Sequence, residues 1–178
     1  MVMDQNIKIL IPRRKIAATV KKLAAEIQQD YADKNPLLIG ILKGSFIFMS
    51  DLVRQINIPL EIDFIRLSSY GTKTCSSGTI TLVHELPSRV QDRHVLVVED
   101  IIDTGLTTDF LLDYLRKKGP ASLKLCALTE KPSRRQTPTV IDYLGFSIPD
   151  KFVVGYGLDF SEKYRNLPDI CFVEEVKP

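Results

Sequence analysis

The sequence predicts an α/β fold in which a central, mainly parallel sheet is flanked by helices. The apolar runs at residues 37–42 and 95–98 are short and continuous, as in strands that are covered on both faces. Each run leads through a polar turn into a stretch with helical periodicity. Strands that alternate with helices in this way build parallel sheets.

The spacing of apolar residues predicts the helices and strands of the first half of the chain. Residues 12–33 are expected to form a helix, because apolar residues recur at three- and four-residue spacing from Ile16 to Tyr31 and Pro12 suits a first turn. The next expected elements are a strand at 37–42, a helix at 45–56, a strand at 61–70, a polar loop at 71–78 and a strand at 79–86. The hairpin-like stretch 61–86 interrupts the alternation of strands and helices.

The second half returns to that alternation. Residues 95–98 form a fully apolar strand, and residues 107–118 form a helix that Gly119 and Pro120 end. Further strands are expected at 122–131, 151–158 and 169–176.

Length and charge limit the possible classes of protein. A chain of 178 residues fits one domain, 1–178, with a substantial core. Its net charge of +2 gives no reason to expect a nucleic-acid partner. No apolar run approaches the ~20 residues of a membrane span, and the N-terminus makes a poor signal peptide.

Three cysteines, Cys75, Cys126 and Cys171, form no CxxC pair. Cys126 and Cys171 lie in apolar, strand-like runs and are expected to be buried thiols, whereas nothing beside Cys75 suggests activation. Free thiols are typical of a reducing compartment, so a cytoplasmic location is expected.

Two polar segments are expected where buried strands end, at residues 43–45 and 99–108. In open α/β sheets, ligands bind beyond the carboxyl ends of the strands. The sequence therefore places the functional site at these two segments.

Residues 103–108 have the properties of a phosphate-binding turn. The first amides of a helix lack an internal partner and attract anions. Gly105 lets the backbone approach a phosphate closely, and the hydroxyls of Thr104, Thr107 and Thr108 can donate further hydrogen bonds. The turn has no Lys and no GxxxxGK[ST] pattern, so it is not a Walker loop.

Glu99 and Asp100 precede that turn and, when ionised, only accept hydrogen bonds. A sugar diol requires such acceptors, and a divalent cation requires oxygens. A ribose 5-phosphate with Mg²⁺ would satisfy both halves of the segment. The alternative is a solvated strand end, with Asp103 as a helix cap.

The stretch VLVVEDIIDTGLT, residues 95–107, closely resembles the 5-phosphoribosyl-1-pyrophosphate (PRPP) signature of type I phosphoribosyltransferases. Four further segments resemble the hypoxanthine(-guanine) branch of that family in the same order, namely GILKGSFIF, LSSYGTKTCSSG, ALTEK and IPDKFVVGYGLDFSEKYRNLPDI. The resemblance thus covers nearly the whole chain. One departure is Leu106, where relatives often carry Lys or Arg.

The resemblance implies a Mg²⁺-dependent transfer of the phosphoribosyl group from PRPP to N9 of hypoxanthine, and of guanine, in purine salvage. It also implies a small hood over the sheet, built from the chain ends, that helps to bind the base. The partners would be small molecules and a second copy of the chain, as a homodimer or homotetramer, with no nucleic acid and no membrane.

Each site residue receives a role from the resemblance. Asp103 would be the catalytic acid–base group, and Glu99 and Asp100 would bind the ribose. The other assignments are Asp103, Thr104, Gly105, Leu106 and Thr107 for the 5-phosphate; Lys43, Gly44, Ser69, Tyr70 and Arg165 for pyrophosphate; Lys131, Phe152, Val153 and Asp159 for the purine; and Glu99, Asp100 and Asp159 for the metal.

The resemblance further implies a cis peptide between Leu42 and Lys43 and a mobile catalytic loop at about 69–77 that closes over the reacting atoms. Ile101 could pack near the sugar, but a core position is the better interpretation. Arg134 and Arg135 are interpreted as a solvated charge run, and His84 and His94 as structural residues.

Two other classes of protein share parts of this pattern. A nucleic-acid-binding regulator can keep the same fold, but it tends to carry a basic face or an added domain. A phosphoacceptor receiver domain also gathers acids at strand ends, but it draws them from separate strands. The nearly balanced charge and the intact acidic set argue against the regulator. The three acids at one strand end, followed by a phosphate-type turn, argue against the receiver.

Overall fold

The computed structural model describes residues 7–70, 79–82 and 89–173. The elements in chain order are β1 (Ile7–Ile11), α1 (Arg13–Asp30), β2 (Leu37–Leu42), α2 (Phe46–Val53), β3 (Glu61–Tyr70), β4 (Thr79–Leu82), β5 (His94–Ile102), α3 (Leu106–Arg116), β6 (Ser122–Glu130), the 3-10 helix η1 (Pro132–Arg134), β7 (Tyr143–Ser147), β8 (Val153–Val154) and β9 (Ile170–Val173).

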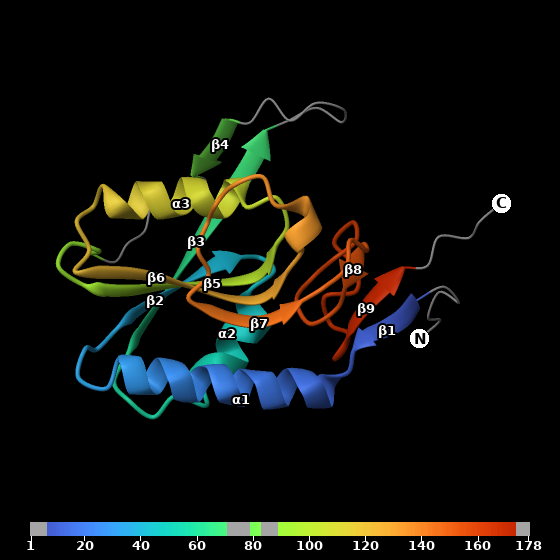
Figure 1. Ribbon diagram of the computed structural model, residues 1–178, viewed down its shortest axis with the longest axis horizontal. Helices are drawn as coiled ribbons and strands as arrows, with labels where there is room; N and C mark the ends of the chain where they lie inside the picture. Colours follow the sequence, from blue (N-terminus) through green and yellow to red (C-terminus); the bar gives the residue numbers. More distant parts are fainter. Residues whose placement is uncertain (1–6, 71–78, 83–88, 174–178) are drawn as a thin grey trace.

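Six strands form the central sheet in the order β4-β3-β2-β5-β6-β7. The pairs from β3 to β7 are all parallel, and β4 is antiparallel to β3. Helix α3 covers one face, and α1 and α2 cover the other (Figure 1). The predicted fold class is confirmed.

A smaller antiparallel sheet, β1-β9-β8, joins the two ends of the described chain beside the central sheet (Figure 1). This is the hood that the resemblance implies. Strand β1 was not predicted, because its five residues are defined mainly by their pairing with β9. Strand β7 was also missed, and its five residues complete the far edge of the central sheet.

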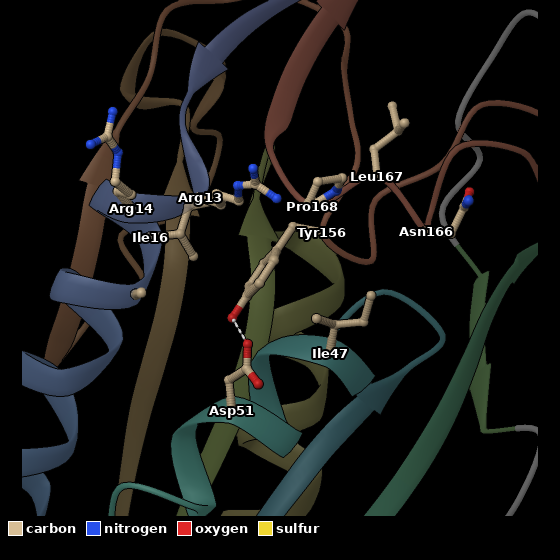
Figure 2. Close-up of a pocket in the computed structure, with 10 residues that line it drawn as sticks. Arg13, Arg14, Ile16, Ile47, Asp51, Tyr156, Asn166, Leu167 and Pro168 are labelled. Carbon is tan, nitrogen blue, oxygen red and sulfur yellow. Dashed lines mark hydrogen bonds between the residues drawn. The ribbon is translucent and has the colours of Figure 1, made fainter. Parts of the chain in front are cut away.

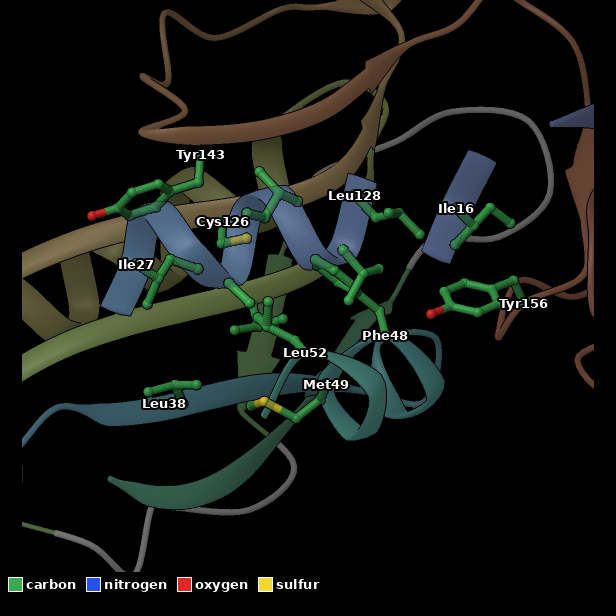
Figure 3. Close-up of a cluster of buried hydrophobic side chains, with 14 of the residues drawn as sticks. Ile16, Ile27, Leu38, Phe48, Met49, Leu52, Cys126, Leu128, Tyr143 and Tyr156 are labelled. Carbon is green, nitrogen blue, oxygen red and sulfur yellow. The ribbon is translucent and has the colours of Figure 1, made fainter. Parts of the chain in front are cut away.

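The core consists of apolar layers on both faces of the sheet. Side chains of α1 and α2, including Ile27 and Phe48, pack against Leu38 and Cys126 of the sheet (Figure 3). Cys126 and Cys171 are buried and free, as predicted. Within the described residues, no helix combines the length and the apolar character that would let it cross a membrane.

Two strand predictions need correction. Strand β5 does not end at residue 98 but continues to Ile102, so the acid pair belongs to the strand itself. The stretch 151–158 is not one strand, because only Val153–Val154 pair as β8. Gly155 and Gly157 have positive φ angles, of 93° and 102°, so the chain leaves the extended conformation after β8.

Candidate active site

A cavity of about 360 Å³ lies at the carboxyl edge of the parallel strands, where the sequence places the site. It brings together segments from β2, β5, β6 and the C-terminal part of the chain. The lining residues are Ile41, Leu42, Lys43, Gly44, Glu99, Asp100, Ile101, Asp103, Lys131, Phe152, Val153, Leu158, Asp159 and Arg165. A neighbouring cavity of about 240 Å³ contains Thr104, Gly105, Thr107 and Thr108 beside Glu99 and Asp103.

The acid pair lies in the buried end of β5. Glu99 is 7% exposed and Asp100 is 6% exposed. Burial and the neighbouring carboxyl group of Asp100 raise the pKa of Glu99 well above its ordinary value. Burial also raises the pKa of Asp100. Two buried carboxyl groups need a nearby cation or hydrogen-bond donors to become fully ionised. The pair is therefore suited to a ligand that brings a cation or several hydroxyl groups.

The turn after β2 forms the opposite wall of the cavity. The peptide between Leu42 and Lys43 is cis, as the resemblance implies. Gly44 faces Asp100 so closely that a Cβ atom at this position would collide with the carboxylate. The Ser45 hydroxyl donates to the carbonyl of Ile41 at 2.7 Å and fixes the end of the turn. The backbone of this turn therefore lies against the acid pair.

The phosphate-type turn begins helix α3. Gly105 has φ of 84°, a left-handed conformation that glycine adopts without steric cost, and Leu106 starts the helix. The amide of Gln136 donates to the carbonyl of Thr104 at 2.9 Å. Arg135 is partly buried against this turn, and its guanidinium donates to the carbonyl of Thr139. The interpretation of Arg135 as a solvated charge was therefore wrong.

Arg165 reaches the cavity from the C-terminal part of the chain. Its guanidinium donates to the carbonyl of Gly157 at 2.8 Å and lies 2.7 Å from the carboxylate of Asp159. Glu162 lies 3.4 Å from Arg165 and 2.9 Å from the ammonium of Lys43. Two cations from distant segments thus converge at one end of the cavity, as the anion-binding assignment of Lys43 and Arg165 requires.

Four charged side chains meet at the other end. Lys131, at the end of β6, is buried, and its ammonium lies 3.7 Å from both Asp103 and Asp150. Arg134 lies 3.1 Å from Asp103, and its side chain is 48% exposed, so it is a solvated charge as predicted, with an ion pair that the prediction did not include. No local sequence pattern indicates this contact, because the partners are 31 residues apart.

One aromatic side chain, that of Phe152, lines the cavity together with Lys131. Phe152 is 54% exposed, although it follows an apolar pattern, and its ring meets that of Phe160 edge to face at 5.3 Å. Phe152 lines the cavity, so its exposed ring can contact a planar ligand there. Phe160 was not singled out from the sequence, where it reads as an ordinary turn residue. Val153 is buried, and Ile101 packs against the core as expected.

Ser69 and Tyr70 were assigned to pyrophosphate binding. Their backbone belongs to β3, so the predicted mobile loop of 69–77 begins within a strand. Residues 71–77, with Cys75, lie outside the described residues, as does His84. His94 Nδ1 lies 2.8 Å from the Ser122 hydroxyl, which agrees with its structural interpretation.

A larger cavity, of about 500 Å³, lies between the start of α1, the helix α2 and the C-terminal segment (Figure 2). There the hydroxyl of Tyr156 donates to the carboxylate of Asp51 at 2.7 Å. None of the site residues predicted from the sequence lines this cavity. The chemistry is therefore concentrated in the smaller cavity at the sheet edge.

Among the described residues, no three His, Cys, Asp or Glu side chains form a ready-made metal cage. Mg²⁺ usually binds to one or two carboxylates together with substrate oxygens, so it does not require such a cage. Glu99, Asp100 and Asp159 line the same cavity and offer such oxygens. The donor set thus fits a cation that arrives with a phosphorylated ligand.

Comparison with known proteins identifies the class. The family model for the phosphoribosyl transferase domain matches residues 8–161. The chain belongs to this family of phosphoribosyltransferases. This confirms the resemblance found in the sequence.

Several relatives are named as hypoxanthine or hypoxanthine-guanine phosphoribosyltransferases. Hypoxanthine-guanine phosphoribosyltransferase of Bacillus subtilis is 47% identical over 92% of this chain and 91% of its own length. A crystal structure of a hypoxanthine-guanine phosphoribosyltransferase from Bacillus anthracis, with HEPES in the active site, is 44% identical and has a TM-score of 0.89 over 93% of this chain and 98% of that chain. The hypoxanthine phosphoribosyltransferase of Trypanosoma cruzi is 37% identical, with a TM-score of 0.90 over 98% and 95% of the two chains.

Proposed function

We propose that this protein transfers the 5-phosphoribosyl group of PRPP to N9 of hypoxanthine or guanine, giving the nucleoside monophosphate and pyrophosphate in purine salvage. One observation carries the proposal. A single cavity joins a buried acid pair, a pair of converging cations and a buried lysine beside an exposed aromatic ring. These groups suit the sugar, the pyrophosphate and the purine, and the phosphate-type turn adjoins them.

The substrate would extend along the cavity. The 5-phosphate would bind to the amides and hydroxyls of the turn around Gly105, and the ribose hydroxyls would donate to Glu99 and Asp100. The pyrophosphate would lie between Lys43 and Arg165. The purine would stack on Phe152, accept a hydrogen bond at O6 from Lys131 and donate one to the carbonyl of Val153.

The reaction replaces the bond from the anomeric carbon to pyrophosphate by a bond to N9 of the base. Negative charge develops on the leaving group, where Lys43 and Arg165 stabilise it. Asp103 accepts the N7 proton of the purine and thereby makes N9 more nucleophilic. The enclosing walls align base and sugar, which accounts for much of the rate enhancement in a displacement of this kind.

Mg²⁺ is part of the proposal. When bound, it would neutralise pyrophosphate charge through substrate oxygens. Glu99, Asp100 and Asp159 would hold it there, either directly or through the ribose hydroxyls. The buried acid pair would be ionised by this ligand, because cationic charge offsets the cost of removing carboxylates from water.

We also propose a homodimer or homotetramer in the cytoplasm. Ile62 and Phe64 point to one face of β3 and are 44% and 37% exposed, and Phe46 at the start of α2 is 43% exposed. Exposed apolar residues on one face are typical of contact surfaces. The free, buried thiols of Cys126 and Cys171 suit a reducing compartment.

The direct test is an assay of the purified protein with Mg²⁺, PRPP and one base at a time. Nucleotide should form from hypoxanthine and guanine, and chelation of the metal should abolish the reaction. Absence of turnover with every purine would overturn the proposal. Sedimentation measurements on the same sample would determine the oligomeric state.

A further inference from the structure

Arg134 belongs to η1, the short 3-10 helix that follows β6. Its side chain turns back toward the cavity and donates from Nε to Oδ1 of Asp103 at 3.1 Å. A surface arginine with no interaction partner would extend into solvent. Here the guanidinium instead holds the carboxylate to which the proposed proton transfer is assigned.

The two oxygens of Asp103 face different partners. Oδ1 accepts from Arg134, whereas Oδ2 lies 3.7 Å from the ammonium of Lys131. Lys131 and Asp103 both line the cavity, but Arg134 does not. The contact with Arg134 therefore occupies Oδ1 and leaves Oδ2 toward the space that the base would fill.

Asp150 completes the arrangement from the segment between β7 and β8. Its carboxylate lies 3.9 Å from Nε of Arg134 and 3.7 Å from the ammonium of Lys131. The two cationic and the two anionic side chains thus alternate in a closed ring of ion pairs. Each cation lies near two carboxylates, so the positive charges of Lys131 and Arg134 are shared between Asp103 and Asp150.

We propose that Arg134 is a positioning residue that fixes the Asp103 carboxylate with Oδ2 directed at N7 of the bound purine. This inference rests on the proposed function. The N7–H bond breaks as its proton moves to Oδ2, and its electron pair stays on the ring. The N9 lone pair then forms the bond to the anomeric carbon, while the pair of the breaking C–O bond leaves with pyrophosphate.

The spacing of the two purine-facing groups agrees with this role. O6 and N7 are neighbouring positions on the edge of a 6-oxopurine. A donor and an acceptor separated by 3.7 Å, as Lys131 Nζ and Asp103 Oδ2 are, can serve both positions at once. Rotation of the carboxylate would break this match, and the Arg134 contact opposes that rotation.

The ion pair itself contributes little to stability. The side chains of Arg134 and Asp103 are 48% and 40% exposed, and exposed pairs are worth little in water. Loss of Arg134 should therefore appear in turnover and not in the unfolding temperature. If Arg134 only covered the protein surface, its loss would change neither the turnover nor the unfolding temperature.

The test compares Arg134→Ala and Arg134→Lys with the control Arg116→Ala. Arg116 is 58% exposed and pairs with Asp113 on α3, outside the cavities of the site. We expect Arg134→Ala to lower kcat about tenfold, as orienting partners of reactive groups do, with the KM for PRPP within about twofold of wild type. Arg134→Lys should recover part of the loss, and Arg116→Ala should match wild type.

A double-mutant cycle supplies a readout that a structural role would not move. In the Asp103→Asn background, Arg134→Ala should change kcat by less than about twofold, because the carboxylate that Arg134 positions is gone. Equal losses in both backgrounds would overturn the inference, and so would unchanged kcat in Arg134→Ala. Inactivity of the wild-type protein would instead refute the proposed function. If Arg134→Ala fails to fold, Arg134→Gln takes its place in the cycle, and an equal loss of kcat from Arg134→Gln in the wild-type and Asp103→Asn backgrounds would overturn the inference.

Discussion

Lys43 and Glu162, 119 residues apart in the chain, form an ion pair of 2.9 Å. The same carboxylate lies 3.4 Å from Arg165. Glu162 therefore links the two cations to which pyrophosphate binding is assigned, and it competes with any anion that approaches both. Contact with Lys43 and Arg165 accordingly lowers the pKa of Glu162 below its ordinary value.

Removal of this competing carboxylate should tighten pyrophosphate binding. We expect Glu162→Gln to lower the Kd for inorganic pyrophosphate by about two- to fivefold at low salt, the range expected of an exposed ion pair. Titration calorimetry at two salt concentrations measures the change. Glu162→Asp keeps the charge, but its shorter side chain should weaken the contact with Lys43, so this variant should also lower the Kd. Glu26→Gln in α1 should leave the Kd unchanged. Weaker binding in Glu162→Gln would show that Glu162 instead positions Lys43 and Arg165.

Base selection should depend on Lys131. Its buried ammonium can donate to the O6 acceptor of hypoxanthine and guanine, whereas adenine presents an amino group there. A site built around one hydrogen bond rejects a partner that cannot form it. We expect negligible turnover of adenine and a loss of about 10²-fold in kcat/KM for hypoxanthine in Lys131→Ala, measured by nucleotide formation. Comparable turnover of adenine would refute this assignment.

Asp103 does not cap helix α3, because the cap residue is Gly105 and no side chain caps the helix, so proton transfer by Asp103 is tested against a purely structural role in the ion pair with Arg134. An asparagine in its place still accepts a hydrogen bond but cannot take a proton. We expect Asp103→Asn to fold and bind PRPP like wild type, with kcat lower by ~10²-fold. Nearly normal kcat in the folded variant would leave Asp103 with a structural role alone.

Close approach of the backbone at Gly44 should be essential for ligand binding. A Cβ atom there would collide with the carboxylate of Asp100, so Gly44→Ala must displace either the turn or the acid. We expect a rise of at least about tenfold in the KM for PRPP. Gly119→Ala is the contrast, because Gly119 has φ of 69° and lies away from the site. That variant should lower the unfolding temperature and leave KM unchanged.

The buried acid pair should cost stability in the absence of ligand. Burial raises the pKa of Glu99, so its stabilising contribution is present below the ordinary carboxyl pKa and is lost as the pH rises through the raised value. We therefore expect Glu99→Gln to be more stable than wild type at pH 8 by about 1 kcal/mol, or about 2–4 °C in Tm. The difference should shrink toward pH 4. Thermal unfolding across this range measures it, and a Tm below that of wild type at pH 8 would contradict the expectation.

The sequence by itself determined the parallel α/β sheet, its main strands and the segments that carry the chemistry. Short apolar runs, helical periodicity and the position of Gly105 are local signals, because they report backbone geometry within a few residues. The motif around Glu99, Asp100 and Asp103 also carried the identity of the family. For these features, neighbouring residues contain the necessary information.

Only the tertiary structure decided which distant side chains meet. The pairing of β1 with β9 builds the hood, and the ion pairs of Arg134 with Asp103 and of Lys43 with Glu162 link segments that no local pattern connects. The same holds for the burial of Glu99 and Asp100, because β5 continues past its apolar run only when neighbouring strands cover it. The free energy of such contacts depends on distance and exposure in the folded chain, and neither quantity is written in the local sequence.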